Sequence, residues 1–151
     1  MLACVLGGKQ LTNGPQGRGE VLKLKFRWIS VLERATPVCE ADAVNAQGFC
    51  PIADLLTDNG GASIADEAEW IADGVAKIDR VLSGQLASDE WLRDIMVAEI
   101  KHDLVAINAY DGDLLYHQTL STNDFRRVLK AWHDFILRGP AEMGDAEQEI
   151  A

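Results

Sequence analysis

The chain has 151 residues, of which 48% are hydrophobic and 25% are charged, and its 24 acidic against 14 basic side chains give a net charge of −10. This length and composition are typical of one folded domain, so residues 1–151 are expected to form a single domain. The acidic excess argues against nucleic acid as a partner, because phosphate binding needs clustered Lys and Arg. A membrane is not expected to be a partner either, because no apolar stretch is long enough to cross a bilayer.

The N-terminal third is predicted to contain one strand after a loosely ordered start. Residues 1–20 are rich in glycine, and we expect little regular structure there. Apolar residues then alternate with the cations Lys23, Lys25 and Arg27, which predicts a half-buried strand across residues 21–31. These cations could form a binding stripe, but a charged solvent face that discourages edge-to-edge aggregation is the favoured interpretation.

The middle of the chain is predicted to be irregular first and helical afterwards. A Thr-Pro pair is expected to end the first strand, and residues 37–61 show no sustained period apart from a short apolar piece at 49–56. This stretch is therefore predicted to be mostly irregular, with at most one short strand or helical turn. A helix is predicted from an N-cap at Ser63 to a C-terminal cap at Gly84, and a second, shorter helix is predicted to begin at Ser88.

The last third begins with a predicted hairpin. Residues 97–110 are rich in β-branched side chains and are predicted to form a strand. Asp111 and Gly112 predict a two-residue loop with both residues at positive φ, followed by a second strand. In that register Ile107 lies opposite Tyr116 on an apolar face.

Two further features complete this region. The alternation changes phase at Leu104, which indicates a bulge or burial on both faces of the strand. Ser121 is predicted to cap a helix that ends at Gly139. The apolar stripe of this helix is predicted to be core and consists of Phe125, Val128, Leu129, Trp132, Phe135 and Ile136.

Together these elements predict an α+β fold. An antiparallel sheet is expected to have helices packed on one face, and its C-terminal β-hairpin is expected to be followed by an amphipathic helix. Residues 141–151 are short, acidic and without pattern, so we expect a frayed acidic tail.

The cysteines indicate the compartment. Cys4, Cys39 and Cys50 are an odd number and have no CxxC spacing, so they are predicted to be free, buried thiols rather than disulfides or metal ligands. Free thiols fit a reducing compartment, and we expect a cytoplasmic protein.

No pattern of residues indicates a catalytic site. No phosphate-binding loop, dinucleotide-binding motif or nucleophile elbow occurs in the sequence. His102, His117 and His133 are far apart in the chain, and an adjacent His-Asp pair is expected to diverge in regular structure. The sequence therefore predicts no catalytic residue and no enzyme, although it leaves open a hydrolase that uses two carboxylates.

A metal or cofactor is not expected either. Asp111 and Asp113 flank a turn glycine, but a calcium loop would need several more spaced oxygen ligands. We therefore predict no metal site and no cofactor.

The distribution of charge is the most informative feature. Residues 1–36 carry six basic and two acidic groups, residues 37–113 carry four and 16, and residues 114–151 carry four and six. Residues 35–76 hold eight acids and no Lys or Arg. This stretch either keeps the protein soluble or docks a basic partner.

The helix after Ser63 is the predicted partner-binding surface, because acids crowd its first turns. Trp70, which lies next to the apolar face of that helix, is interpreted as core or as a half-exposed anchor. The predicted partner-binding residues are Asp66, Glu67, Glu69, Trp70 and Asp73.

The last third resembles a known class of proteins. The strand at 97–110, the Asp111-Gly112 turn and the helix sequence LSTNDFRRVLKAWHDFI at 120–136 are similar to small acidic immunity proteins of bacterial contact-dependent growth inhibition and related polymorphic toxin systems. The resemblance implies a cytoplasmic antitoxin that binds and neutralises its cognate toxin domain, commonly a nuclease. Two other classes stay open: a small enzyme or ligand-binding protein that uses a cleft between sheet and helices, and an acidic interaction adaptor.

Overall fold

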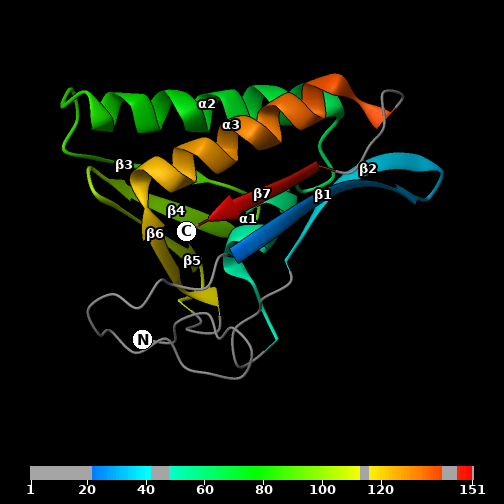
Figure 1. The fold of residues 1–151 in the computed structure, drawn as a ribbon, viewed down its shortest axis with the longest axis horizontal. Coiled ribbons are helices and arrows are strands. Elements are labelled where there is room, and N and C mark those ends of the chain that lie inside the picture. The colour runs from blue at the N-terminus through cyan, green and yellow to red at the C-terminus, as the bar shows by residue number, and fades with distance from the viewer. Residues whose placement is uncertain (1–21, 42–47, 113–115, 141–145, 151) are drawn as a thin grey trace.

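The protein has an α+β fold with two antiparallel sheets and three helices among the described residues (Figure 1). A computed structural model describes residues 22–41, 48–112, 116–140 and 146–150. The glycine-rich segment 1–20, Cys4 and Asp113 lie outside these residues. Within them, no helix combines the length and the apolar content needed to cross a membrane.

The first sheet has the strand order β2-β1-β7. Strand β1 (Leu22–Val31) confirms the predicted alternation, since its apolar side chains at 22, 24 and 26 are buried. Strand β2 (Arg34–Ala41) corrects the prediction that Pro37 ends the strand and begins an irregular stretch. Strand β2 lies at the edge of this sheet, where a proline costs no hydrogen bond to a further strand.

Residues 146–150 of the predicted acidic tail are not frayed, whereas residues 141–145 and 151 lie outside the described residues. Residues Ala146–Ile150 form strand β7, which pairs antiparallel with β1. Lys23 lies opposite Glu149 and Lys25 opposite Glu147, and opposite charges at such positions favour pairing. The acidic composition that indicated a tail therefore does not prevent this segment from pairing with β1.

The second sheet is a meander with the order β3-β4-β5-β6. Strand β3 (Ser88–Leu92) replaces the short helix predicted at Ser88, because Trp91 must point into the core from an extended backbone. Strands β4 (Met96–Lys101) and β5 (Leu104–Ala109) are separate, and the phase change at Leu104 marks the turn between them rather than a bulge. Strand β6 (Gln118–Ser121) pairs with β5.

The predicted hairpin exists, but its loop and register differ from the prediction. Gly112 has a φ of +74°, whereas Asp111 is not at positive φ. The N–H of Gly112 donates to the carbonyl of Ala109, so the chain turns earlier than a two-residue loop requires. Ile107 consequently lies opposite Gln118 and not Tyr116.

Three helices join the sheets. Helix α1 (Pro51–Thr57) is longer than the single turn predicted for this stretch and begins with proline, which suits a first helical position. Helix α2 (Ile64–Leu82) confirms the predicted caps, because Ser63 Oγ accepts the N–H of Asp66 at 3.1 Å and Gly84 has a φ of +80°. Helix α3 (Thr122–Arg138) is capped in the same way by Ser121 and ends at Gly139.

Helices α2 and α3 run side by side over one face of the four-stranded sheet (Figure 1). Gly74 allows this close approach, because a Cβ atom there would lie 2.7 Å from Trp91 and 2.9 Å from Leu129. Helix α3 also contacts the first sheet, where Phe26 packs edge-on against Trp132 with 5.0 Å between ring centroids. The whole predicted stripe of α3 is buried, namely Phe125, Val128, Leu129, Trp132, Phe135 and Ile136.

The turn between β1 and β2 stores backbone strain. Leu32 (φ 47°) and Glu33 (φ 63°) are both left-handed, although neither is Gly, Asn or Asp, and Leu32 is 92% exposed.

Leu32→Asn with Glu33→Gly should raise the free energy of unfolding by about 1 to 2 kcal/mol, because Asn and Gly adopt positive φ at low cost. Urea denaturation measures the gain. Leu137→Asn, which also removes an exposed leucine, should give no gain; equal gains would show that surface polarity and not turn strain is the cause.

Candidate functional site

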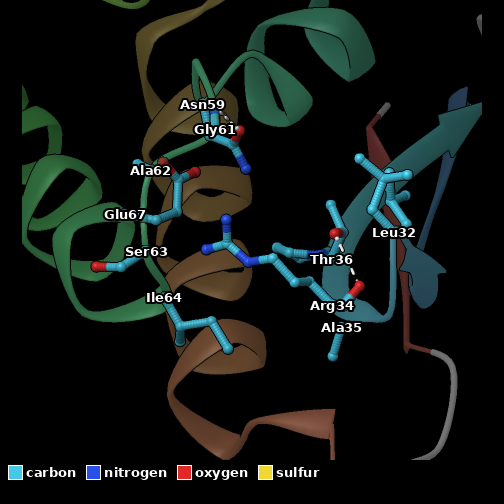
Figure 2. Close-up of a pocket in the computed structure, with 12 residues that line it drawn as sticks. Leu32, Arg34, Ala35, Thr36, Asn59, Gly61, Ala62, Ser63, Ile64 and Glu67 are labelled. Atoms are coloured by element: carbon cyan, nitrogen blue, oxygen red, sulfur yellow. Dashed lines mark hydrogen bonds between the residues drawn. The ribbon is translucent and has the colours of Figure 1, made fainter.

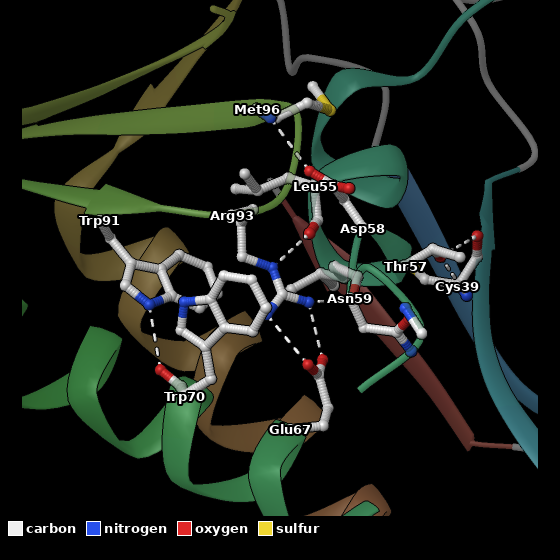
Figure 3. Close-up of polar contacts among 12 residues, drawn as sticks. Cys39, Leu55, Thr57, Asp58, Asn59, Glu67, Trp70, Trp91, Arg93 and Met96 are labelled. Carbon is white, nitrogen blue, oxygen red and sulfur yellow. Dashed lines mark hydrogen bonds and ion pairs between the residues drawn. The ribbon is translucent and has the colours of Figure 1, made fainter. Parts of the chain in front are cut away.

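Arg93 is a buried cation at the centre of the described structure (Figure 3). It lies in the turn between β3 and β4. Its guanidinium binds both carboxylate oxygens of Glu67 on α2, at 2.7 and 3.0 Å. It also donates to the carbonyls of Leu55 and Leu56 at 2.9 and 2.8 Å, which fills acceptors that the last turn of α1 leaves open.

Two indole rings enclose this ion pair. The Arg93 Cζ atom lies 4.7 Å from the ring centroid of Trp70 and 4.8 Å from that of Trp91. Trp70 Nε1 donates to the carbonyl of Leu92 at 2.6 Å, and Trp91 Nε1 donates to the carbonyl of Trp70 at 3.0 Å. The guanidinium is thus paired, hydrogen-bonded and buried beside two aromatic rings, which is the condition for burying a charge.

The predicted partner-binding residues of α2 separate into two groups. Glu67 is only 1% exposed and is held by Arg93, so its carboxylate is not available to a partner. Trp70 is half-buried in the same network. Asp66, Glu69 and Asp73 are exposed and present a negative face to solvent.

A second acidic feature was not anticipated from the sequence. Two adjoining cavities of about 360 and 300 Å³ share Ile95, Met96 and Tyr116. Their lining comes from five separate segments, and we call them together the acidic cleft. The lining residues are Phe49, Asp54, Thr57, Asp58, Asp94, Ile95, Met96, Ala109, Tyr110, Asp111 and Tyr116.

Asp58 fixes the wall of the acidic cleft. It follows the last residue of α1, and its Oδ2 accepts the backbone N–H groups of Ile95 at 2.9 Å and Met96 at 3.0 Å (Figure 3). Tyr110 donates its hydroxyl to the carbonyl of Arg93 at 3.2 Å. The wall of the cleft is therefore built on the turn that carries Arg93.

Three carboxylates of the cleft, Asp54, Asp58 and Asp94, form no ion pair with a cation among the described residues. The lining contains no Lys or Arg. Ion pairs between described residues neutralise other acids, namely Glu40, Glu67, Asp79, Asp89 and Asp124. None of these pairs includes Asp54, Asp58 or Asp94.

Asp54 lies one helical turn before Asp58. Burial and then the nearby charge of Asp58 raise the pKa of the Asp54 carboxyl above its usual value. Its Oδ2 atom is buried and has no hydrogen-bond partner among the described residues. This carboxylate is held in an environment that disfavours its charge, which is a common property of functional sites.

Apolar groups complete the cleft. The rings of Phe49 and Tyr116 lie 4.7 Å apart between centroids, and Ile95 is 60% exposed at the rim. Carboxylates beside half-buried aromatic and exposed aliphatic groups suit a ligand that combines a positive charge with an apolar stem. Lys and Arg side chains of a protein are such ligands.

A larger groove of about 580 Å³ lies between the β1–β2 hairpin and the start of α2 (Figure 2). Its rim carries the exposed side chains of Leu32 and Ile64. Figure 2 shows Arg34 extending into the groove towards Glu67, which is already neutralised by Arg93. The groove is therefore lined by charges of both signs, whereas the charged residues that line the acidic cleft are all acidic.

The histidines and cysteines do not assemble a reactive site in the described part of the chain. His102 and Asp103 do contact each other, at 2.8 Å, because they lie in a tight turn where the expected divergence does not apply. His117 Nδ1 instead lies 2.7 Å from the side-chain oxygen of Asn108. Cys39 and Cys50 are buried and form no disulfide, as predicted, and burial raises the pKa of the Cys39 thiol.

A search of the described residues found no group of three His, Cys, Asp or Glu side chains that could hold a metal ion. This covers the acidic cleft.

Replacing Arg93 by Met should lower the free energy of unfolding by about 3 to 5 kcal/mol, because Glu67 is left as a buried, unpaired charge. Urea denaturation followed by circular dichroism measures the loss. The double variant Arg93→Met with Glu67→Leu should recover part of it, although the carbonyls of α1 stay uncapped. A double variant whose loss equals the sum of the two single losses would contradict this coupling.

The raised pKa of Asp54 predicts a specific pH dependence. The folded state binds more protons than the unfolded state between the usual pKa of 3.8 and the raised value, so the Asp54 contribution to stability falls as pH rises through this window. Asp54→Asn should remove that fall. The variant should therefore gain stability relative to the wild type with rising pH, measured by urea denaturation across a pH series. A difference that does not change with pH would contradict the assignment.

No family model matches this sequence, and neither a curated protein nor a solved structure was found to match it.

Proposed function

We propose that the chain is an immunity protein that binds and neutralises a cognate toxin domain, and that the acidic cleft is where it docks. One observation carries the proposal: a cleft with apolar walls holds three carboxylates, Asp54, Asp58 and Asp94, that form no ion pair with a cation among the described residues. A basic surface on a partner protein would supply the missing charge. The resemblance to immunity proteins, which covers roughly residues 63–138, supports the choice of a toxin as that partner.

Physical chemistry supports the pairing of an acidic protein with a toxin of the nuclease type. A nuclease must present Lys and Arg to the phosphates of its substrate, so its active face is basic. A protein with a net charge of −10 is drawn to such a face, and opposite fields speed association. Apolar rim residues such as Ile95 then add apolar contact area to the attraction between the charges. Such an antitoxin acts in the cytoplasm and needs no catalysis of its own.

The exposed acids of α2 fit the same proposal as an outer part of the interface. Asp66, Glu69 and Asp73 can steer a basic partner from a distance, because exposed charges act mainly on the rate of encounter. The cleft is proposed to hold the closer contacts. The two surfaces are therefore expected to differ in what their substitution changes.

The proposal requires a toxin domain to be encoded by a neighbouring gene, and the test measures the affinity of this chain for that domain by calorimetric titration at low and physiological salt. Asp94→Lys, which reverses an exposed charge in the cleft, should weaken binding by about tenfold or more and reduce the salt dependence. Glu99→Lys makes the same charge change on an exposed position of β4 outside the cleft and should have a much smaller effect. Thermal melting checks that each variant is folded.

Three results would contradict the proposal in different ways. If the wild-type protein fails to bind the toxin domain, the immunity function is wrong. If Asp94→Lys and Glu99→Lys weaken binding equally, net charge rather than the cleft governs the interaction. If the triple variant Asp66→Lys, Glu69→Lys and Asp73→Lys abolishes binding while Asp94→Lys does not, the interface lies on α2.

A further inference from the structure

We infer that the acidic cleft receives one arginine side chain of the partner protein, whose guanidinium meets Asp54 and Asp58 while its stem lies against Phe49 and Tyr116. The inference rests on the proposed function and deepens it, because it names the group that the cleft recognises. Four features of the cleft carry it: the paired acids, the buried orphan oxygen, the aromatic walls and the small volume.

A bound cation would reduce an electrostatic repulsion that already exists between Asp54 and Asp58. Asp54 and Asp58 are four residues apart, and like charges at this spacing repel each other. Asp58 Oδ2 already accepts hydrogen bonds from two backbone N–H groups of the β3–β4 turn. Asp54 Oδ2 is buried without any hydrogen-bond donor among the described residues. A guanidinium carries five N–H donors, so it can supply both the donor and the opposite charge.

The walls favour arginine over lysine. Phe49 and Tyr116 present two tilted rings in contact with each other, and Met96 lies between the two cavities. A guanidinium is planar, stacks on aromatic faces and is more weakly hydrated than an ammonium group. The protein places its own Arg93 in comparable surroundings, beside two indole rings and against a carboxylate.

The size and charge of the site disfavour other occupants. The cavity that contains both acids is about 300 Å³, which is at the lower limit of small-molecule pockets. An anion such as phosphate would be repelled. A divalent metal ion would need more oxygen ligands than the described residues bring together.

The experiment titrates the isotopically labelled protein with N-acetyl-arginine methylamide and follows backbone amide shifts by NMR. We expect saturable shifts at the cleft, in Phe49, the β3–β4 turn and Tyr116. The lysine analogue should bind more weakly, and the norleucine analogue, which keeps the stem without the charge, should cause no shift. Asp54→Asn should weaken arginine binding by about fivefold, whereas Glu99→Gln, outside the cleft, should leave it unchanged.

Each contrary result has a defined meaning. Shifts that follow the exposed acids Asp66 and Asp73 as strongly as the cleft would overturn the inference, because they indicate unspecific charge attraction. Equal binding of the arginine and lysine analogues would overturn the choice of arginine. Calcium or magnesium ions that reproduce the same shifts would show a metal site instead.

The inference and the proposed function can fail separately. The arginine probe needs no toxin. If the probe binds in the cleft but the toxin domain does not bind, the arginine pocket is supported and the immunity function is wrong. If the toxin domain binds and Asp54→Asn does not weaken it, the function stands and the arginine pocket is wrong.

Discussion

The described structure depends on one buried ion pair, that of Arg93 with Glu67. Arg93 and Glu67 are 3% and 1% exposed, and a charge buried this deeply is tolerated only when it is paired and hydrogen-bonded. The guanidinium achieves this by joining three elements: the end of α1, the first turns of α2 and the turn between β3 and β4. If any one of these elements moved, a charge or a carbonyl would lose its partner in a water-poor environment.

The same turn positions the proposed site. Because Arg93 holds the β3–β4 turn against α1, the next residues of that turn, Ile95 and Met96, come within hydrogen-bond distance of Asp58. Tyr110 is then tied to the carbonyl of Arg93. The acidic cleft is therefore formed on a rigid support, and a preformed cleft binds a partner at a lower entropic cost than one that must be ordered on binding. Stability and the proposed recognition therefore share one structural origin in this protein.

Charge has two separate roles in the chain. Within the sheets and between the helices, acids are paired with cations, as Lys77 and Arg80 are with Asp89 and as Arg126 is with Asp79. On the exposed side of α2 and in the cleft, acids such as Asp73 and Asp94 face solvent. This division separates acids that stabilise the fold from acids that are free to meet a partner. The net charge of −10 reports their sum but does not distinguish them.

The sequence by itself determined the elements whose signals are local. Helices α2 and α3 were predictable because capping residues such as Ser63 and Ser121 act within one turn and the apolar period runs along each helix. Strand β1 was predictable from its alternation.

The tertiary structure alone decided the elements that need a distant partner. Strand β7 forms because β1 offers it an edge to pair with, β2 tolerates its proline because it lies at an edge, and β3 is extended because Trp91 fits against Gly74 of α2. The candidate site divides in the same way, since the acids near Asp66 were visible as a charged run, whereas the cleft joins segments from Phe49 to Tyr116 that only folding brings together. Pairings such as Arg93 with Glu67, 26 residues apart, leave no periodic trace in a sequence, because the energy that selects them arises only when both groups lose water together.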